Sequence, residues 1–151
     1  MSSQDQMYFE DVEIGDELGP IERVADPEMI KAFMEVSNRR GPSVFNDPDT
    51  AKKAGWEAPV TPGHMLMAFI SQLLSRWFGQ VWIRDIDLIL RRPLLVNQQV
   101  RVTGIVTDKS LIDGRGHVEC DVILYNADGE RTSTGKASVT VPLKNPGDRD
   151  S

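Results

Sequence analysis

The sequence predicts an α+β protein in which an antiparallel sheet wraps around one long buried helix. Residues 63–78 are apolar on nearly every side, which is typical of a helix without a solvent face. Most of residues 81–141 alternates apolar with polar residues, as antiparallel strands with one covered face do. The length of 151 residues suits one domain with a core of its own.

Composition and charge exclude several classes of protein. The single cysteine, Cys120, excludes an intramolecular disulfide framework and a multi-cysteine zinc site, and two histidines leave little for a histidine-rich metal centre. A net charge of −6 argues against nucleic-acid binding, which needs a basic surface. The longest apolar run, residues 65–70, is too short to span a membrane, and residues 1–6 carry no secretory signal. We therefore expect a soluble, cytoplasmic, acidic protein.

One domain is predicted over residues 8–143, with flexible tails at 1–7 and 144–151. Within it, Asp26 and the following proline are suited to start a first helix. Residues 38–48 then form an irregular loop, whose length makes it a candidate for function. A second, short helix is expected to follow that loop, over residues 50–54.

The long helix is expected to be capped by Thr61, with Pro62 in its first turn, and to end at Gly79. The Asp128-Gly129 pair predicts a hairpin turn. Strands are predicted at residues 81–91, 100–107, 116–125 and 131–141. A sheet wrapped around one helix is the hot-dog arrangement, and its open edges favour dimerisation.

From about Tyr8 to Val141 the chain resembles the MaoC-like family of (R)-specific enoyl-CoA hydratases and acyl dehydratases, a branch of the hot-dog superfamily. The resemblance implies addition of water to a trans-2-enoyl thioester of coenzyme A or acyl carrier protein, or the reverse reaction. It implies no cofactor beyond the carrier, which is part of the substrate. The blocks that carry it are residues 8–18, which look like the family's first strand, and residues 47–51, 55–60, 63–66, 92–100, 126–130 and 135–137.

The resemblance also implies a catalytic pair that this chain does not supply. Family members carry an Asp and a His five positions apart in the loop after the first helix, where the pair activates a water. With the loop aligned on its Asp-Pro dipeptide, the pair falls on Arg40 and Phe45. With the loop aligned at the end of the first helix, it falls on Arg39 and Val44.

At the start of the long helix, His64 is the sharpest alternative candidate. The family's usual histidine before the helix glycine is replaced by Pro62, and a histidine follows Gly63 instead. The positive end of the helix dipole favours a neutral imidazole, which can act as a base near pH 7. Local packing beside Thr61 is an equally open interpretation. In the family, a backbone N–H such as that of Gly63 holds the thioester oxygen, although this glycine also suits a tight helix entry.

The other candidates each have a structural alternative. Asp47 is a possible replacement acid or base, but capping of the short helix is the interpretation we favour. Asn38 and Asn46 are suited to orient a water or the thioester carbonyl, and equally to form turns. Arg39 and Arg40 are suited to coenzyme A phosphates, or to a solvated loop. The predicted substrate-binding set also includes Phe45, Thr61 and Met65. An acyl tunnel or simple packing is open for Phe45, Trp77 and Trp82, while Cys120 is expected to be buried and His117 exposed.

Three functions remain open from the sequence. The first is a hydratase or dehydratase that uses His64 or Asp47 for acid–base chemistry. The second is a non-catalytic acyl-binding chain in a heteromer with a second MaoC-like chain, as some family members are built. The third is a hot-dog acyl-CoA thioesterase in which Asp47 activates water. The expected partners are an acyl thioester and a second hot-dog chain, in a homodimer or heterodimer, with neither nucleic acid nor membrane.

Overall fold

The computed structural model describes residues 6–145, so residues 1–5 and 146–151 of the predicted tails at 1–7 and 144–151 lie outside the described residues. Its elements, in chain order, are the 3-10 helix η1 (Phe9–Asp11), β1 (Glu17–Val24), α1 (Pro27–Val36), α2 (Pro48–Lys53), α3 (Gly63–Phe78), β2 (Trp82–Leu90), β3 (Gln99–Ile112), β4 (Arg115–Tyr125) and β5 (Arg131–Val141). No helix within residues 6–145 is long and apolar enough to cross a membrane.

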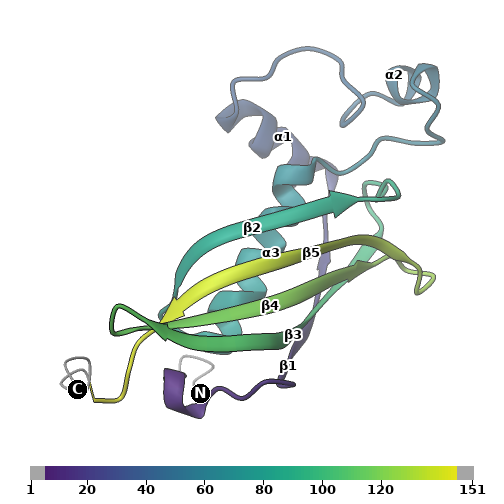
Figure 1. The fold of residues 1–151 in the computed structure, drawn as a ribbon. Helices are drawn as coiled ribbons and strands as arrows, with labels where there is room; N and C mark the ends of the chain where they lie inside the picture. The colour runs from purple at the N-terminus through teal and green to yellow at the C-terminus, as the bar shows by residue number, and fades with distance from the viewer. Residues whose placement is uncertain (1–5, 146–151) are drawn as a thin grey trace.

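The five strands form one antiparallel sheet in the order β1-β3-β4-β5-β2. Figure 1 shows this sheet curved across α3, with α1 and α2 beyond the end at which α3 begins and β2 ends. The arrangement confirms the predicted α+β hot-dog fold. Because β1 and β2 are the edge strands, the sheet is open on both sides.

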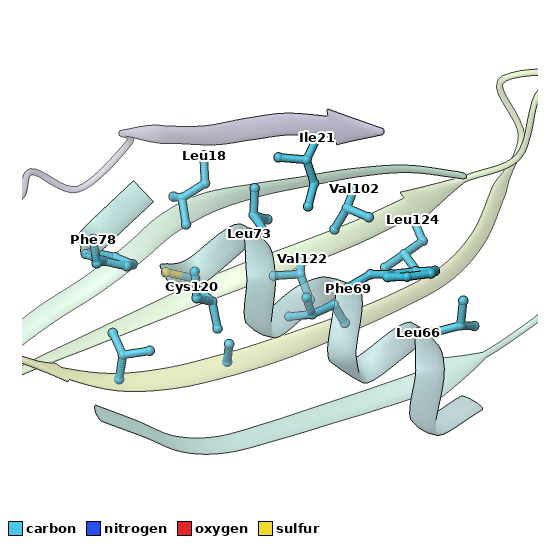
Figure 2. Packing of buried hydrophobic residues seen from close by; sticks show 14 of the residues in the cluster. Leu18, Ile21, Leu66, Phe69, Leu73, Phe78, Val102, Cys120, Val122 and Leu124 are labelled. Carbon is cyan, nitrogen blue, oxygen red and sulfur yellow. The ribbon is translucent and has the colours of Figure 1, made fainter. Parts of the chain in front are cut away.

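The core lies between α3 and the inner face of the sheet. Figure 2 shows Phe69 and Leu73 of the helix directed toward sheet residues that include Val122 and Leu124. All four are at most 2% exposed. Cys120 belongs to the same layer, and burial raises the pKa of its thiol to about 12. Its prediction as a buried structural thiol is confirmed.

One side of α3 is left uncovered, contrary to the prediction of a helix buried all round. The exposed positions include His64, Ala68, Gln72 and Ser75, which recur at helical spacing along one face. The sheet covers only the opposite face, where Leu66, Phe69, Ile70, Leu73 and Leu74 are buried. The bounds of the helix agree with the prediction.

Three local predictions are wrong. Residues 8–18 do not form one strand. They contain η1 and a turn at Gly15, whose φ is +98°, and β1 begins only at Glu17. Thr61 does not cap α3, because Pro62 occupies the N-cap position and no side chain of the described residues caps the helix. The strand predicted at 100–107 continues to Ile112 and turns into β4 through Asp113 and Gly114, both at positive φ.

Parts of both predicted tails are bonded to the domain. The side chain of Gln6 donates to the carbonyl of Phe78 at 3.0 Å and accepts from the N–H of Gln80 at 2.7 Å. Near the other end, Lys144 Nζ lies 2.7 Å from a carboxylate oxygen of Asp11, and this ion pair lowers the pKa of Asp11. The two ends therefore contribute contacts where α3 ends and at the last residue of η1.

Candidate functional site

The candidate site lies around the connecting segment, which we define as residues 37–62 between α1 and α3. Its last residues are fastened to the chain that leads from β2 to β3. The N–H of Thr61 donates to the carbonyl of Leu94 at 2.7 Å, and the N–H of Val96 donates to the carbonyl of Pro59 at 2.9 Å. Val60 and Leu95 form an antiparallel bridge between these contacts. The connecting segment is thereby held at the end of the sheet where α3 begins.

A cavity of about 440 Å³ lies between α1 and the connecting segment. Its size is within the range of small-molecule sites. Apolar side chains form much of its wall, and charged side chains of α1 and the loop stand beside them. The lining residues are Pro27, Ile30, Lys31, Met34, Glu35, Arg39, Gly41, Phe45, Asn46, Pro59 and Val96.

Three of the predicted substrate-binding residues meet at this cavity: Arg39, Phe45 and Asn46. The guanidinium carbon of Arg39 lies 5.7 Å from the centroid of the Phe45 ring, a cation–π distance. The side-chain oxygen of Asn46 accepts from the N–H of Ser43 at 2.8 Å, so this residue also holds a turn of the loop. Arg40 is exposed and is not among the lining residues.

Sequence reasoning missed Lys31 and Glu35 as lining residues. Both belong to the amphipathic helix α1, and with Pro27 they recur every four residues. That spacing places them along one side of the helix, and it is the sequence signal that could have identified them. Asn38 lies just beyond the helix at φ +56°, a left-handed conformation in which it serves as a turn residue.

Asp47 caps α2, as the favoured interpretation predicted. Its carboxylate accepts from the N–H of Thr50 at 3.0 Å and from the Thr50 hydroxyl at 2.6 Å. These two hydrogen bonds hold the pKa of Asp47 below its usual value. A carboxylate stabilised as the anion is a weak base, so the geometry does not favour Asp47 as the group that activates water.

The first turn of α3 forms the second part of the candidate site. Gly63 is half-buried and His64 is exposed. Within residues 6–145, neither backbone N–H has an acceptor, as is usual for the first residues of a helix without a side-chain cap. A Cβ atom at Gly63 would lie 3.2 Å from Cδ1 of Leu90, so any larger residue would press on the end of β2.

The remaining candidates do not line the cavity. Met65 is only 6% exposed and belongs to the core, and Trp77 packs edge-to-face on Phe78 with ring centroids 4.9 Å apart. Trp82 is 73% exposed on the edge strand β2. His117 is half-buried on β4, so the prediction that it is exposed is wrong. Its neighbours across the sheet, Ser110 and Thr140, share its face and reduce its exposure.

No protein-family model matches the chain. A curated relative, the mitochondrial 3-hydroxyacyl-[acyl-carrier-protein] dehydratase of Arabidopsis thaliana, is 33% identical over 79 residues, which are 52% of this chain and 46% of the relative. The match thus spans about half the length of that protein.

Solved structures resemble the chain over most of its length. The (R)-hydratase from A. caviae involved in PHA biosynthesis has a TM-score of 0.76 at 22% identity, covering 87% of this chain and 98% of its own. The MaoC-like dehydratase from Rhodospirillum rubrum has a TM-score of 0.76 at 20% identity, covering 92% and 99%. A chain of the HadBC (3R-hydroxyacyl-ACP dehydratase) complex from Mycobacterium tuberculosis has a TM-score of 0.73 at 16% identity, covering 84% and 96%. The chain therefore has the hot-dog fold that the MaoC-like hydratases and dehydratases share.

Proposed function

We propose that this chain is a hydratase or dehydratase of acyl thioesters. It adds water to a trans-2-enoyl thioester of coenzyme A or acyl carrier protein, or removes water from a 3-hydroxyacyl thioester. The curated relative and the (R)-hydratase that share sequence or fold with the chain carry this type of activity in their names. The observation that carries the proposal is the first turn of α3, where a half-buried glycine begins a 16-residue helix without a side-chain cap.

This turn is suited to stabilise negative charge on a thioester oxygen. The N–H groups of Gly63 and His64 have no acceptor within residues 6–145, and the helix dipole adds positive potential at the same place. Negative charge develops on the thioester oxygen as water adds to the double bond or leaves. Preorganised backbone donors lower the barrier because they are already oriented before the charge appears. The absence of a side chain at Gly63 leaves room for the thioester.

His64 is the proposed acid–base group. Its side chain is exposed beside the same turn, and histidine is the side chain most often used in general acid–base catalysis. Asp47 is assigned to capping, since its carboxylate already accepts two hydrogen bonds from Thr50. In this proposal the cavity under the connecting segment receives the carrier arm or the acyl chain, and Arg39 at its wall attracts a phosphate.

The proposal is tested by following loss of the enoyl-thioester absorbance with the full chain, for crotonyl-CoA and longer enoyl-CoA substrates and for the corresponding carrier-protein thioesters. We expect turnover by the wild type and a loss of roughly a hundredfold in His64→Ala, the scale of general acid–base catalysis. His117→Ala is the matched control. His117 lies on β4 opposite Ser110 and Thr140 and has no part in the proposed site, so this variant is expected to keep the activity. Release of free thiol without hydration would identify a thioesterase instead.

A second candidate is a non-catalytic acyl-binding subunit of a heteromeric hydratase. The observation that favours it is Phe45, whose apolar ring lines the cavity. When the loop is aligned on its Asp-Pro dipeptide, this phenylalanine stands where the family has its catalytic histidine. The HadBC (3R-hydroxyacyl-ACP dehydratase) complex, which has a chain of the same fold, is a precedent for a dehydratase built as a complex. If the purified chain shows no turnover but gains it with a copurifying second hot-dog chain from the native source, this candidate replaces the first.

We also propose that a second hot-dog chain, identical or different, pairs with the edge strand β2. This strand pairs only with β5 within residues 6–145, so its other edge is free. It exposes Trp82, Ile89 and Leu90, which are more than half accessible. Apolar side chains on an open strand edge are a typical surface for strand pairing between chains. Size-exclusion chromatography with light scattering gives the mass, and a monomer at all concentrations would contradict the pairing.

A further inference from the structure

Two hydroxyl groups near the first turn of α3 are buried without a partner. Thr61 is 6% exposed and Ser133 is 0% exposed. Neither Thr61 Oγ1 nor Ser133 Oγ has a hydrogen-bond partner within residues 6–145. A buried hydroxyl without a partner is costly, and in folded proteins such groups are generally completed by a ligand or an ordered water. Each of these hydroxyls therefore points to a polar group from outside the chain.

Ser133 lies on the part of the sheet that faces the start of α3. It pairs with Leu124 of β4 on one side and with Leu90 of β2 on the other. Ser133 is buried, and it lies four positions before the buried Ala137 on the same strand. Its side chain is therefore on the inner face of the sheet. Leu90, its cross-strand neighbour, approaches the first residue of α3, since a Cβ at Gly63 would be 3.2 Å from the Leu90 side chain.

Thr61 reaches the same place from the connecting segment. It precedes Gly63 by two residues, and its N–H donates to the carbonyl of Leu94. Leu90 is the strand neighbour of Ser133, and Leu94 accepts the hydrogen bond from Thr61. The short stretch from Leu90 to Leu94 therefore connects the surroundings of the two hydroxyls. Along this stretch, Arg92 donates its N–H to the carbonyl of Thr132 at 3.0 Å, which keeps it against β5. Thr61 thus lies two residues before the first turn of α3, and Ser133 is connected to the same turn through Leu90. Within residues 6–145 the N–H groups of Gly63 and His64 in this turn have no acceptor.

The chemistry of these groups selects the ligand. A hydroxyl donates one hydrogen bond and accepts others, so two of them suit a neutral O–H group better than an anion. We propose that Thr61 and Ser133 bind a hydroxyl at the start of α3, namely the water that adds to the enoyl thioester or the 3-hydroxyl of the hydrated product. This inference rests on the proposed function. It assigns to two neutral side chains the water-holding role that the Asp/His pair has in related enzymes.

The test uses Thr61→Val and Ser133→Ala in the full chain, because both changes remove a hydroxyl and nearly conserve the volume. We expect kcat to fall roughly tenfold or more in each, the scale of one hydrogen bond to a reacting group. We expect the thermal midpoint to stay or rise, because an unpaired buried hydroxyl is removed. The matched control is Thr132→Val, next to Ser133 on β5. Its buried hydroxyl donates to the carbonyl of Leu124 at 3.2 Å, so this variant is expected to lose stability and to keep kcat.

A raised midpoint with unchanged kcat in Thr61→Val and Ser133→Ala would overturn the inference, because the hydroxyls would then be merely unpaired. A fall in the midpoint as large as that of Thr132→Val would also overturn it, because the hydroxyls would then be bonded within the protein.

A binding measurement separates this inference from the proposed function. Calorimetry compares 3-hydroxybutyryl-CoA with butyryl-CoA, which lacks only the hydroxyl. We expect the wild type to prefer the hydroxylated ligand and both variants to lose that preference, whether or not the wild type turns over an enoyl thioester. Equal affinity of the wild type for the two ligands, or binding of neither, overturns the inference. Failed turnover with a retained preference overturns only the proposed function.

Discussion

The layer of α3 against the sheet and the connecting segment differ in how their backbones are held. In the layer, β3, β4 and β5 are joined by long antiparallel ladders, each with one register shift, and α3 closes the core beneath them. The connecting segment contains one short helix, α2, and is otherwise held by turns and by its contacts with residues 94–96. The cavity and the first turn of α3 both border this segment. The difference teaches that this chain builds stability in one region and places its candidate chemistry beside the other.

The largest expected effect compares two phenylalanines, one from each region. Phe69 is 2% exposed in the core, whereas Phe45 is half-buried at the cavity wall. We expect Phe69→Ala to lower the free energy of unfolding by about 3–5 kcal/mol, because it leaves a cavity in a closed core. Phe45→Ala is expected to cost roughly 1 kcal/mol, as for typical substitutions outside the core. Urea denaturation measures both, and equal costs would mean that the connecting segment is as tightly packed as the layer.

The second effect concerns the boundary between the two regions, at Gly63. The added methyl group of Gly63→Ala would lie 3.2 Å from the side chain of Leu90, which is more than half exposed and free to move. Alanine is also favourable in a helix, so we expect the thermal midpoint to change little. Under the proposed function the methyl would crowd the approach of the thioester to this turn, and we expect kcat/KM to fall roughly tenfold.

Leu90→Ala supplies the control for this prediction. It relieves the contact with the new methyl group without altering the helix, so the double variant separates crowding of β2 from obstruction of the ligand. Full recovery of activity in the double variant would mean that Gly63 matters for packing and not for the thioester.

Much of the layer could be predicted from the sequence because its pattern is repeated over long stretches. The apolar residues of 63–78 and the alternation of 116–125 both gave element bounds close to those observed. The hairpin between β3 and β4 was missed, although its Asp113-Gly114 pair is a strong turn signal of the same kind as Asp128-Gly129. The sequence itself therefore carries the signal for this turn.

The candidate site could be predicted only in part, because long-range contacts define it. The unusual length of the loop and the glycine at the start of α3 were both visible in the sequence. The cavity was not visible, since it forms only when Val96 and Pro59 bring the connecting segment against α1. Ser133 was missed for the same reason. Its polar side chain belongs to an inward-facing strand position that becomes meaningful only next to Leu90 and the first turn of α3.

The smallest expected effect is the pH dependence of the cap at Asp47, which fixes α2 within the connecting segment. Hydrogen bonds from Thr50 hold the pKa of this carboxyl below its ordinary value of 3.8 in the folded state. The folded state therefore binds the proton less readily than the unfolded state does. The resulting stabilisation is complete above the unfolded pKa and is lost as the pH falls from about 3.8 through the lower folded value.

Asp47→Asn preserves an N-cap acceptor without the charge, so it should remove this acid dependence while α2 stays capped. The measurement is the difference in thermal midpoint between the wild type and Asp47→Asn at pH values from neutral to acidic. We expect a small advantage of the wild type at neutral pH that shrinks below about pH 4, since Asp47 is only half-buried and solvent screens its interactions. An advantage that grows on acidification would mean that the carboxyl is protonated in the folded state. Asp47 would then return as a candidate acid, and the connecting segment would take part in the chemistry directly instead of shaping the cavity around it.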